Sequence, residues 1–547
     1  MKSFFLRVFA VAFFIAAAQK SSAQNILTDQ AELHGNFQLD AQYYNVDTLI
    51  GAPIVPEKIL SNGFMNLWYT KGNFSAGIRY ENYLNVMQGF DSRYKGSGIP
   101  FRFATYTNDK LEATVGNFYE QFGGGLILRA YEERGLGFDN VLDGARVKYE
   151  PIPGLVIKAL VARQRAFFSL SPGILRGGDV ELNINDAFLS GKDYKTRIVL
   201  GASALSRYQD DQDPVYNLPE NVAAFGGRLN VIRGKFNVAA EYGYKINDPS
   251  SNNKLIYRPG QALNLSATYS TKGFGILVSA KRLDNFDFRS DRTAAGNAYN
   301  INFLPAATRQ HTYNLPATIY PYATQPNGEV GYQVELSWRI KKGSLLGGKY
   351  GTEVTINASG TNGLDKTASA NDTLGYESEF FKVGKEVYFR DYHLEIHKKF
   401  NKSWKSTLML LYWVYNKDVV QGLKGFGTIY APMAVLDVAY KINDKNTIRV
   451  EAQTLLTEQD EGSWAMGLIE YTYSPNWFVA VVDQYNFGNQ LDEKRIHYLT
   501  LNMGFMRKGN RIMVGYGRQR AGIFCVGGVC RNVPASNGLT ISILSSF

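Results

Sequence analysis

The sequence predicts an all-β fold, a single large transmembrane antiparallel β-barrel of about 24 strands. Apolar and polar residues alternate in segments spread along the whole chain, which is the pattern of strands with one apolar face. Short and long connections alternate between these segments, and the chain ends on Phe547 inside one of them.

The first residues have the pattern of a signal peptide. Two basic residues precede an apolar run at 8–18, and small residues at 21–23 suit a cleavage site. At about 11 residues, the run is too short for a membrane-spanning helix. We therefore expect residues 1–23 to direct export through the inner membrane and to be cleaved. Residues 24–547 would then form one barrel in the outer membrane.

Composition favours strands and turns throughout the mature chain. Gly (53), Tyr (35) and Phe (33) are abundant, and no Pro/Ser tract or charge block divides the sequence into domains. The formal net charge of +10 is spread thinly over 547 residues. Because no basic tract is present, we predict no nucleic-acid partner.

The alternation is clear near the start of the mature chain. Apolar residues at odd positions from Leu33 to Tyr43 oppose polar residues at even positions from Glu32 to Gln42. A soluble β-sandwich shows the same alternation, with its apolar face inward. The pattern alone therefore does not decide between sandwich and barrel. It recurs at 236–246, 330–340 and 447–454.

The connections favour the barrel. Tight links such as Thr70–Asn73 and Arg233–Lys235 alternate with long ones, and aromatic pairs such as Tyr269 and Phe274 flank the tight links. Outer-membrane barrels have short periplasmic turns, long extracellular loops and aromatic girdles, whereas one sandwich would not extend over more than about 500 residues. Less regular segments at 101–107, 178–189 and 476–486 widen the strand count to about 22–26. The long connections are 44–60, 84–100, 120–142, 209–220, 247–260, 284–328, 360–386, 416–429 and 521–537.

The C-terminal segment ends the chain on an aromatic residue. In residues 538–547 the alternation continues to Phe547. Because a barrel leaves no free edge, we expect this last strand to pair with the first. Phe547 also resembles the terminal signature that outer-membrane barrels present to their assembly machinery. The predicted partners are therefore outer-membrane lipid, that machinery and possible further envelope proteins.

Three stretches carry a family resemblance: Gly116–Arg134 with Asp139 and Asn140, then Tyr320–Glu329, then Cys525–Ala535 with the terminal strand. Together they resemble an uncharacterised family of Bacteroidota outer-membrane barrel proteins, a domain of unknown function that covers nearly the whole chain. The resemblance implies the fold and the location. It implies no activity, cofactor or site residue.

The only two cysteines are Cys525 and Cys530. Their spacing suits either a metal or a disulfide, but no histidine adjoins them. In an exported chain the disulfide is favoured. His393, Glu395 and His397 also suggest a metal, but on a strand the two rings would lie about 13 Å apart. We predict a polar ladder there and no metal.

Polar side chains on the strands and in one long loop are the candidate lumen or constriction residues. Their charges are mixed, so they predict either a paired polar wall or a translocation path without strong ion preference. Loop 120–142, with its Gly123–Gly125 run, would either fold inward and narrow the bore or stay exposed. Loop 284–328 is apolar enough to pack into the barrel mouth or against a partner. The candidates are Arg129, Glu132, Arg134, Asp139, Arg146, Lys148, Arg228, Glu241, Glu335, Arg339, Arg449 and Glu451.

Three functions fit these features. The first is a porin-like, passive or gated channel for an unidentified solute. The second is a barrel subunit or docking platform of a larger outer-membrane assembly for secretion, protein insertion or nutrient uptake. The third, an enzyme, is disfavoured because the sequence signals no Ser/His/Asp or paired-acid constellation.

Overall fold

The computed structural model describes residues 31–189, 194–294, 298–526 and 529–547. The predicted signal peptide lies outside these residues. The side chains of residues 524–531, which include both cysteines, also lie outside the described part.

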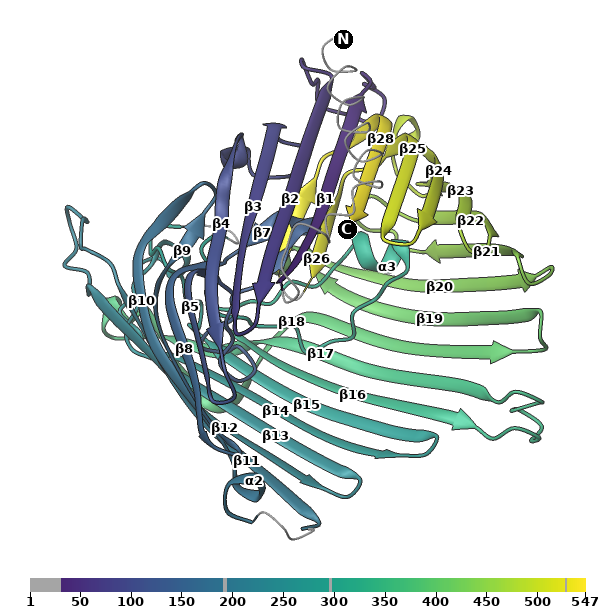
Figure 1. Ribbon diagram of the computed structural model, residues 1–547. Helices are drawn as coiled ribbons and strands as arrows, with labels where there is room; N and C mark the ends of the chain where they lie inside the picture. Colours follow the sequence, from purple (N-terminus) through teal and green to yellow (C-terminus); the bar gives the residue numbers. More distant parts are fainter. Residues whose placement is uncertain (1–30, 190–193, 295–297, 527–528) are drawn as a thin grey trace.

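The described residues form one closed, antiparallel, 24-stranded barrel (Figure 1), which confirms the predicted fold class. Each strand pairs with its neighbours in chain order. The strands are β1 (Ala31–Tyr44), β2 (Ile59–Lys71), β3 (Phe74–Asn85), β4 (Gly96–Thr107), β5 (Leu111–Phe118), β8 (Leu142–Ile152), β9 (Leu155–Ala166), β10 (Ser169–Asn183), β11 (Thr196–Tyr208), β12 (Asn221–Arg233), β13 (Phe236–Lys245), β14 (Gly260–Thr271), β15 (Phe274–Asp284), β16 (Glu329–Ile340), β17 (Thr352–Ala368), β18 (Tyr376–Lys399), β19 (Trp404–Asn416), β20 (Thr428–Lys441), β21 (Asn446–Leu455), β22 (Trp464–Tyr473), β23 (Trp477–Tyr485), β24 (His497–Arg507), β25 (Asn510–Gln519) and β28 (Ser536–Ser546).

Smaller elements lie in the connections. Two short hairpins are β6 (Glu132–Glu133) with β7 (Phe138–Asp139) and β26 (Gly522–Val526) with β27 (Val529–Val533). The α-helices of the described residues are α2 (Ile184–Phe188), α3 (Asn314–Thr318) and α4 (Lys417–Val420). None of these helices is long and apolar enough to cross a membrane.

The barrel closes where β28 meets β1, side by side in Figure 1. Asn36 lies opposite Ser546, and the pairing continues to Tyr44 opposite Gly538. Phe547 extends it, because its N–H and carbonyl both bond to Gly35 at 3.0 Å. Its ring lies over Gly35, where an added Cβ would approach it to 2.4 Å. The expected pairing of the last strand with the first is confirmed.

The connections divide between two rims, as expected. Tight links such as 71–74 and 233–236 lie on the short-turn rim with both barrel termini, and the long connections lie on the long-loop rim. The expected loop at 360–386 is wrong in extent, because β17 and β18 continue as a hairpin and leave only 369–375 between them. The irregular segment 178–189 is strand only to Asn183, which caps α2 by accepting from the Asp186 N–H.

The outward face of the barrel is apolar. In β19, Leu408, Leu410 and Tyr412 are 37–44% exposed, whereas the alternating residues Leu411 and Trp413 are buried. Both faces of this strand are therefore apolar. The inward face packs against chain that lies inside the barrel.

Candidate functional site

Residues 119–141, here the first plug loop, leave the wall after β5 and turn into the bore before β8. Phe122, Leu126, Ile127 and Leu128 are at most 1% exposed. They pack in one apolar cluster with inward residues of β8–β15. Of the two alternatives for this segment, the structure has the inward-folded one.

Residues 285–328, here the second plug loop, cross the bore between β15 and β16. Phe286, Phe288 and Ile301 share the apolar cluster of the first plug loop. Further along, Leu315 and Tyr320 pack in a second cluster with inward residues of β18–β22. The described part of this loop, 285–294 and 298–328, therefore contacts the barrel wall in two separate places, one in each cluster.

Hydrogen bonds join the two plug loops. The Arg129 N–H donates to the Ile301 carbonyl at 2.8 Å, and the Phe303 N–H donates to the Gly125 carbonyl at 2.9 Å. The Asn140 amide donates to carbonyls of both loops, those of Arg129 and Asn300. The loops therefore form one packed body inside the barrel.

A buried ionic network ties the first plug loop to the wall. Asp139 lies 2.5 Å from Arg79 of β3 and 2.8 Å from Arg165 of β9. Arg165 also contacts Glu81 at 2.6 Å, and Glu132 contacts Arg79 at 3.0 Å. All five side chains except Glu132 are at most 6% exposed. Because a buried charge is costly without its partners, these groups strongly favour the inward position of the loop.

Ion pairs also fix the second plug loop and its end. Arg309 contacts Glu335 at 3.2 Å and Glu395 at 2.8 Å. At the start of β16, Glu329 pairs with Lys281 of β15 at 2.5 Å. These contacts place charged side chains of the loop against those of β16 and β18.

A histidine and an aspartate meet beside Arg309. His311 Nε2 lies 2.9 Å from Asp391, which also accepts from the Trp413 indole at 3.0 Å. Among the described residues, no group of His, Cys, Asp and Glu could hold a metal ion. His393 and His397 lie on the inward face of β18, where His397 contacts the Thr407 hydroxyl.

The far end of the second plug loop is held near the long-loop rim. Tyr320 donates to Asp460 at 3.2 Å, and Lys417 contacts the same carboxylate at 2.6 Å. Burial raises the pKa of Tyr320 well above its ordinary value, and Asp460 adds to that shift. The hydroxyl therefore stays protonated. Arg520 donates to Thr318 of α3.

Two cavities adjoin the plug loops. The larger, about 550 Å³, is lined by Gly124, Arg228, Glu241, Lys281 and Gln333, among others. The Gly124 N–H donates to Glu241 at 2.9 Å, so this turn of the first plug loop forms part of the cavity wall. A second cavity of about 280 Å³ lies within the second plug loop, against Phe389 and Trp413. Polar and charged groups of both signs line the larger one.

The structure brings many of the candidate residues to the plug loops. Arg129 lies over the rings of Tyr131 and Phe303, and Arg134 pairs with Glu132. Arg339 is different, since it pairs with Glu353 at the short-turn rim and is 62% exposed. Lys148 is half-buried on β8. The other candidates pair as follows: Asp139 with Arg79 and Arg165, Arg146 with Glu112 and Glu120, Arg228 with Asp179 and Glu181, Glu241 with the Gly124 N–H, Glu335 with Arg309, and Arg449 with Asp437 and Glu451.

Sequence reasoning missed other buried charges. Arg165 was not among the candidate residues, because its partner Glu81 is 84 residues away in the sequence. Arg207 pairs with Asp248 at 2.8 Å, and both are at most 2% exposed. The sequence shows only that a charged residue lies at the long-loop end of an alternating strand. This pattern does not identify the residue with which it forms an ion pair.

The predicted disulfide stays a prediction. The backbone places Cys525 of β26 directly opposite Cys530 of β27. Their side chains lie outside the described part of the chain.

Comparisons with solved structures find siderophore receptors, ferric enterobactin receptors and OccK8 (OprE). The siderophore receptor PirA of Acinetobacter baumannii is 10% identical (TM-score 0.43), with 94% of this chain and 80% of that chain covered. The ferric enterobactin receptor PfeA of Pseudomonas aeruginosa, in complex with BCV-L6, is 11% identical (TM-score 0.41), with 94% and 81% covered. OccK8 (OprE) of P. aeruginosa is 10% identical (TM-score 0.33), with 83% and 98% covered. Structural similarities this weak do not identify a ligand for this chain.

None of the curated proteins compared with the chain matches it. A family model does, and it matches residues 1–547. The chain belongs to a family of unknown function, DUF6029.

Proposed function

We propose that this protein is an outer-membrane, porin-like barrel whose two plug loops gate a transport path through the bore. The observation that supports this most is the joined pair of plug loops, packed inside the barrel with a polar cavity of about 550 Å³ against them. A wide barrel without such a filling would leak. The proposal includes a non-enzymatic role, an origin in Bacteroidota and insertion by the barrel-assembly machinery.

The membrane part of the proposal rests on the outward face. Leu410 is 44% exposed there, among other apolar side chains. An arginine at the bilayer midplane of such a face costs about 2–4 kcal/mol. We therefore expect Leu410→Arg to lower the free energy of unfolding in lipid vesicles by roughly that amount.

Leu423 provides the matched control. It is 46% exposed but lies in the loop between α4 and β20. Leu423→Arg should leave the unfolding free energy in vesicles unchanged. Equal effects of the two substitutions would mean that β19 does not face lipid.

The gating part is tested by releasing the second plug loop. Leu315 of α3 is fully buried in the apolar cluster beside β18–β22. A carboxylate there would be buried without a partner, which is costly. We expect Leu315→Asp to move this part of the loop off the wall. Single-channel conductance in planar bilayers should rise several-fold over the native protein.

Leu345→Asp is the control, because Leu345 is 99% exposed in the turn between β16 and β17. Its conductance should equal that of the native protein. A Leu315→Asp barrel that is folded and as silent as the native one would contradict gating by the second plug loop.

A docking platform is the second candidate function. Apolar side chains are exposed on the long loops, including Ile54 at 73% and Val215 at 78%. A protein partner seated on the long-loop rim would cover them. Extraction in mild detergent should then bring out a stoichiometric partner that Ile54→Asp with Val215→Asp releases. A lone monomer in native extracts would count against this alternative.

A further inference from the structure

The barrel wall has a seam beside β4. The ladder between β4 and β5 ends where Phe103 lies opposite Gly116. Beyond that level β5 ends at Phe118 and β8 begins at Leu142, because the chain between them turns into the bore. In the described structure, residues 96–102 of β4 thus have a strand partner only on the β3 side.

Backbone geometry fixes where the ladder stops. Gly116 has φ +90°, and an added Cβ would lie 2.3 Å from the Arg102 carbonyl oxygen. The Arg102 N–H bonds instead to the side chain of Asn117 at 2.8 Å. At this level a side chain replaces the ladder hydrogen bond.

Side chains also close the seam above that level. Arg165, at the end of β9, reaches Glu81 of β3 with two hydrogen bonds of 2.6 and 2.8 Å. The rings of Phe167 and Tyr94 are 4.7 Å apart, and Phe168 lies against Gly98 of β4. Contacts of this kind can open and re-form without unpairing a strand.

An ion pair lies on the outward face of the seam. Arg102 projects outward, opposite Ile78, and pairs with Asp143 of β8 at 3.3 Å. Its side chain is 58% exposed, and Asp143 is its one side-chain partner among the described residues. Arg102 lies five residues before Thr107, the end of β4 at the short-turn rim, or about 16 Å along the strand. That position falls within an apolar band about 25 Å tall, where a charge is costly.

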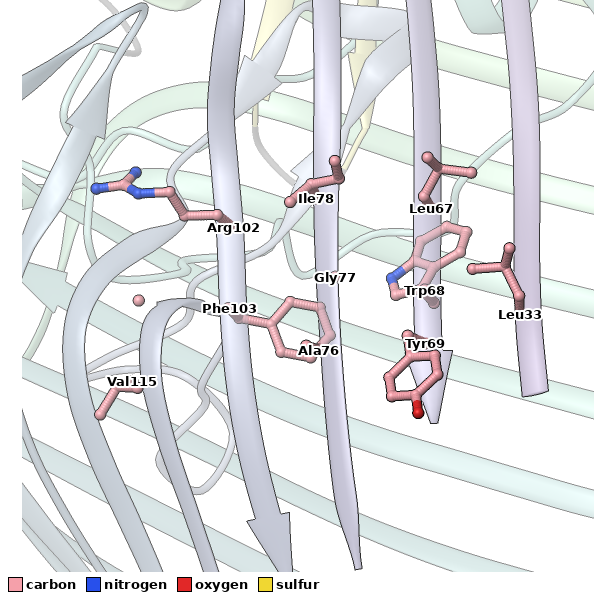
Figure 2. Close-up of a pocket in the computed structure, with 11 residues that line it drawn as sticks. Leu33, Leu67, Trp68, Tyr69, Ala76, Gly77, Ile78, Arg102, Phe103 and Val115 are labelled. Atoms are coloured by element: carbon pink, nitrogen blue, oxygen red, sulfur yellow. The ribbon is translucent and has the colours of Figure 1, made fainter. Parts of the chain in front are cut away.

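An apolar groove of about 460 Å³ starts at Arg102 on the outer surface. Figure 2 shows Arg102 projecting from β4 away from the aliphatic residues of β1–β3 and towards the side of β5. Val115 on β5 lies on the same side of β4, below Arg102 in this view. The groove is lined by Leu33, Leu67, Tyr69, Ala76, Ile78 and Val115, with others.

We propose that this seam is a lateral portal for an anionic amphiphile with a single acyl chain. The acyl chain would lie in the groove, and the anionic headgroup would replace the Asp143 carboxylate on Arg102, the one positively charged side chain among the described residues that line the groove. Opening of the Arg165–Glu81 contact would connect the groove with the bore. This inference rests on the proposed transport function and names its substrate class.

The groove is tested with a diazirine-bearing fatty acid and the full-length protein in phosphatidylcholine nanodiscs. Photolabelling should fall on the groove peptides that contain Leu67 and Val115. Arg102→Leu should reduce it about tenfold, as expected for loss of one charge-assisted contact. Arg102→Lys should retain most of it.

Arg339→Leu is the matched control, because Arg339 is a similarly exposed, ion-paired arginine away from the groove. It should leave the labelling unchanged. The methyl ester of the probe should label the groove weakly. Equal labelling by acid and ester, or by native protein and Arg102→Leu, would overturn the binding site and leave only unspecific lipid contact.

The portal is tested with the same probe. Arg165→Gln should let the label reach the first plug loop, and a short cross-link between cysteines placed at Gly98 and Phe168 should abolish that labelling. Label that reaches the loop despite the cross-link, or never reaches it, would overturn the portal. The ion conductance of Leu315→Asp does not depend on the seam. A Leu315→Asp barrel without conductance would therefore contradict the gated channel, whereas the labelling of the groove tests the binding site independently.

Discussion

A chain that lacks residues 536–547 is expected to form no barrel at all. These residues are β28, which pairs with β1 on one side and β25 on the other, and Phe547, which extends the pairing to Gly35. Their loss would leave two strand edges unpaired in lipid, where each unsatisfied backbone group costs several kcal/mol. The unboiled protein should lose its compact, fast-migrating band in detergent gels.

Single substitutions in the same strand are expected to impair barrel formation less than the truncation does. Phe547→Ala removes only the ring over Gly35 and should weaken the folded state without abolishing it. Leu539→Ala shortens an outward side chain that is 38% exposed, and its band should be native. A truncated chain that inserts into membranes as a compact barrel would mean that closure does not depend on β28.

The sequence predicted closure well, because each part of it is a local pattern. The period-two alternation of β1 and of β28 can be recognised within each strand. Because these are the first and the last strand of the barrel, closure requires that they pair with each other. The alternation fails where the wall packs against the plug loops. In β19 the inward residues Leu411 and Trp413 are as apolar as their outward neighbours, and only the second plug loop explains why.

The candidate site was less accessible to sequence reasoning. The Gly123–Gly125 run and the charges that follow it indicated that the first plug loop is special, and this loop packs inside the barrel. The partners of those charges come from distant strands, as Arg165 and Glu81 do. Such pairs depend on the register of the whole barrel. Arg339 shows a different limit: the alternation grouped it with the lumen residues, although it lies one residue before the end of β16 at the short-turn rim and is 62% exposed.

Asp139→Asn is expected to release the first plug loop while the wall stays intact. The Asp139 carboxylate accepts from Arg79, Arg165 and the Tyr119 hydroxyl and is 6% exposed. Its neutralisation removes one carboxylate partner from each arginine, while Glu81 still pairs with both. The loss of hydrogen bonds to a charged group costs about 1.5–3 kcal/mol. Amide hydrogen exchange in residues 119–141 should therefore become about tenfold to a hundredfold faster. Exchange in β3 and β9 should keep its native rate, since their ladders do not involve this side chain.

Glu353→Gln separates this effect from a general response to lost charge. Glu353 pairs with Arg339 but is half-exposed, and such pairs contribute about 0–1 kcal/mol. Its exchange pattern should equal that of the native protein. Faster exchange of Asp139→Asn in strands and plug loop alike would mean that the ionic network holds the barrel itself. Faster exchange confined to 119–141, together with raised ion conductance, would mark Asp139 as part of the latch that keeps the bore filled.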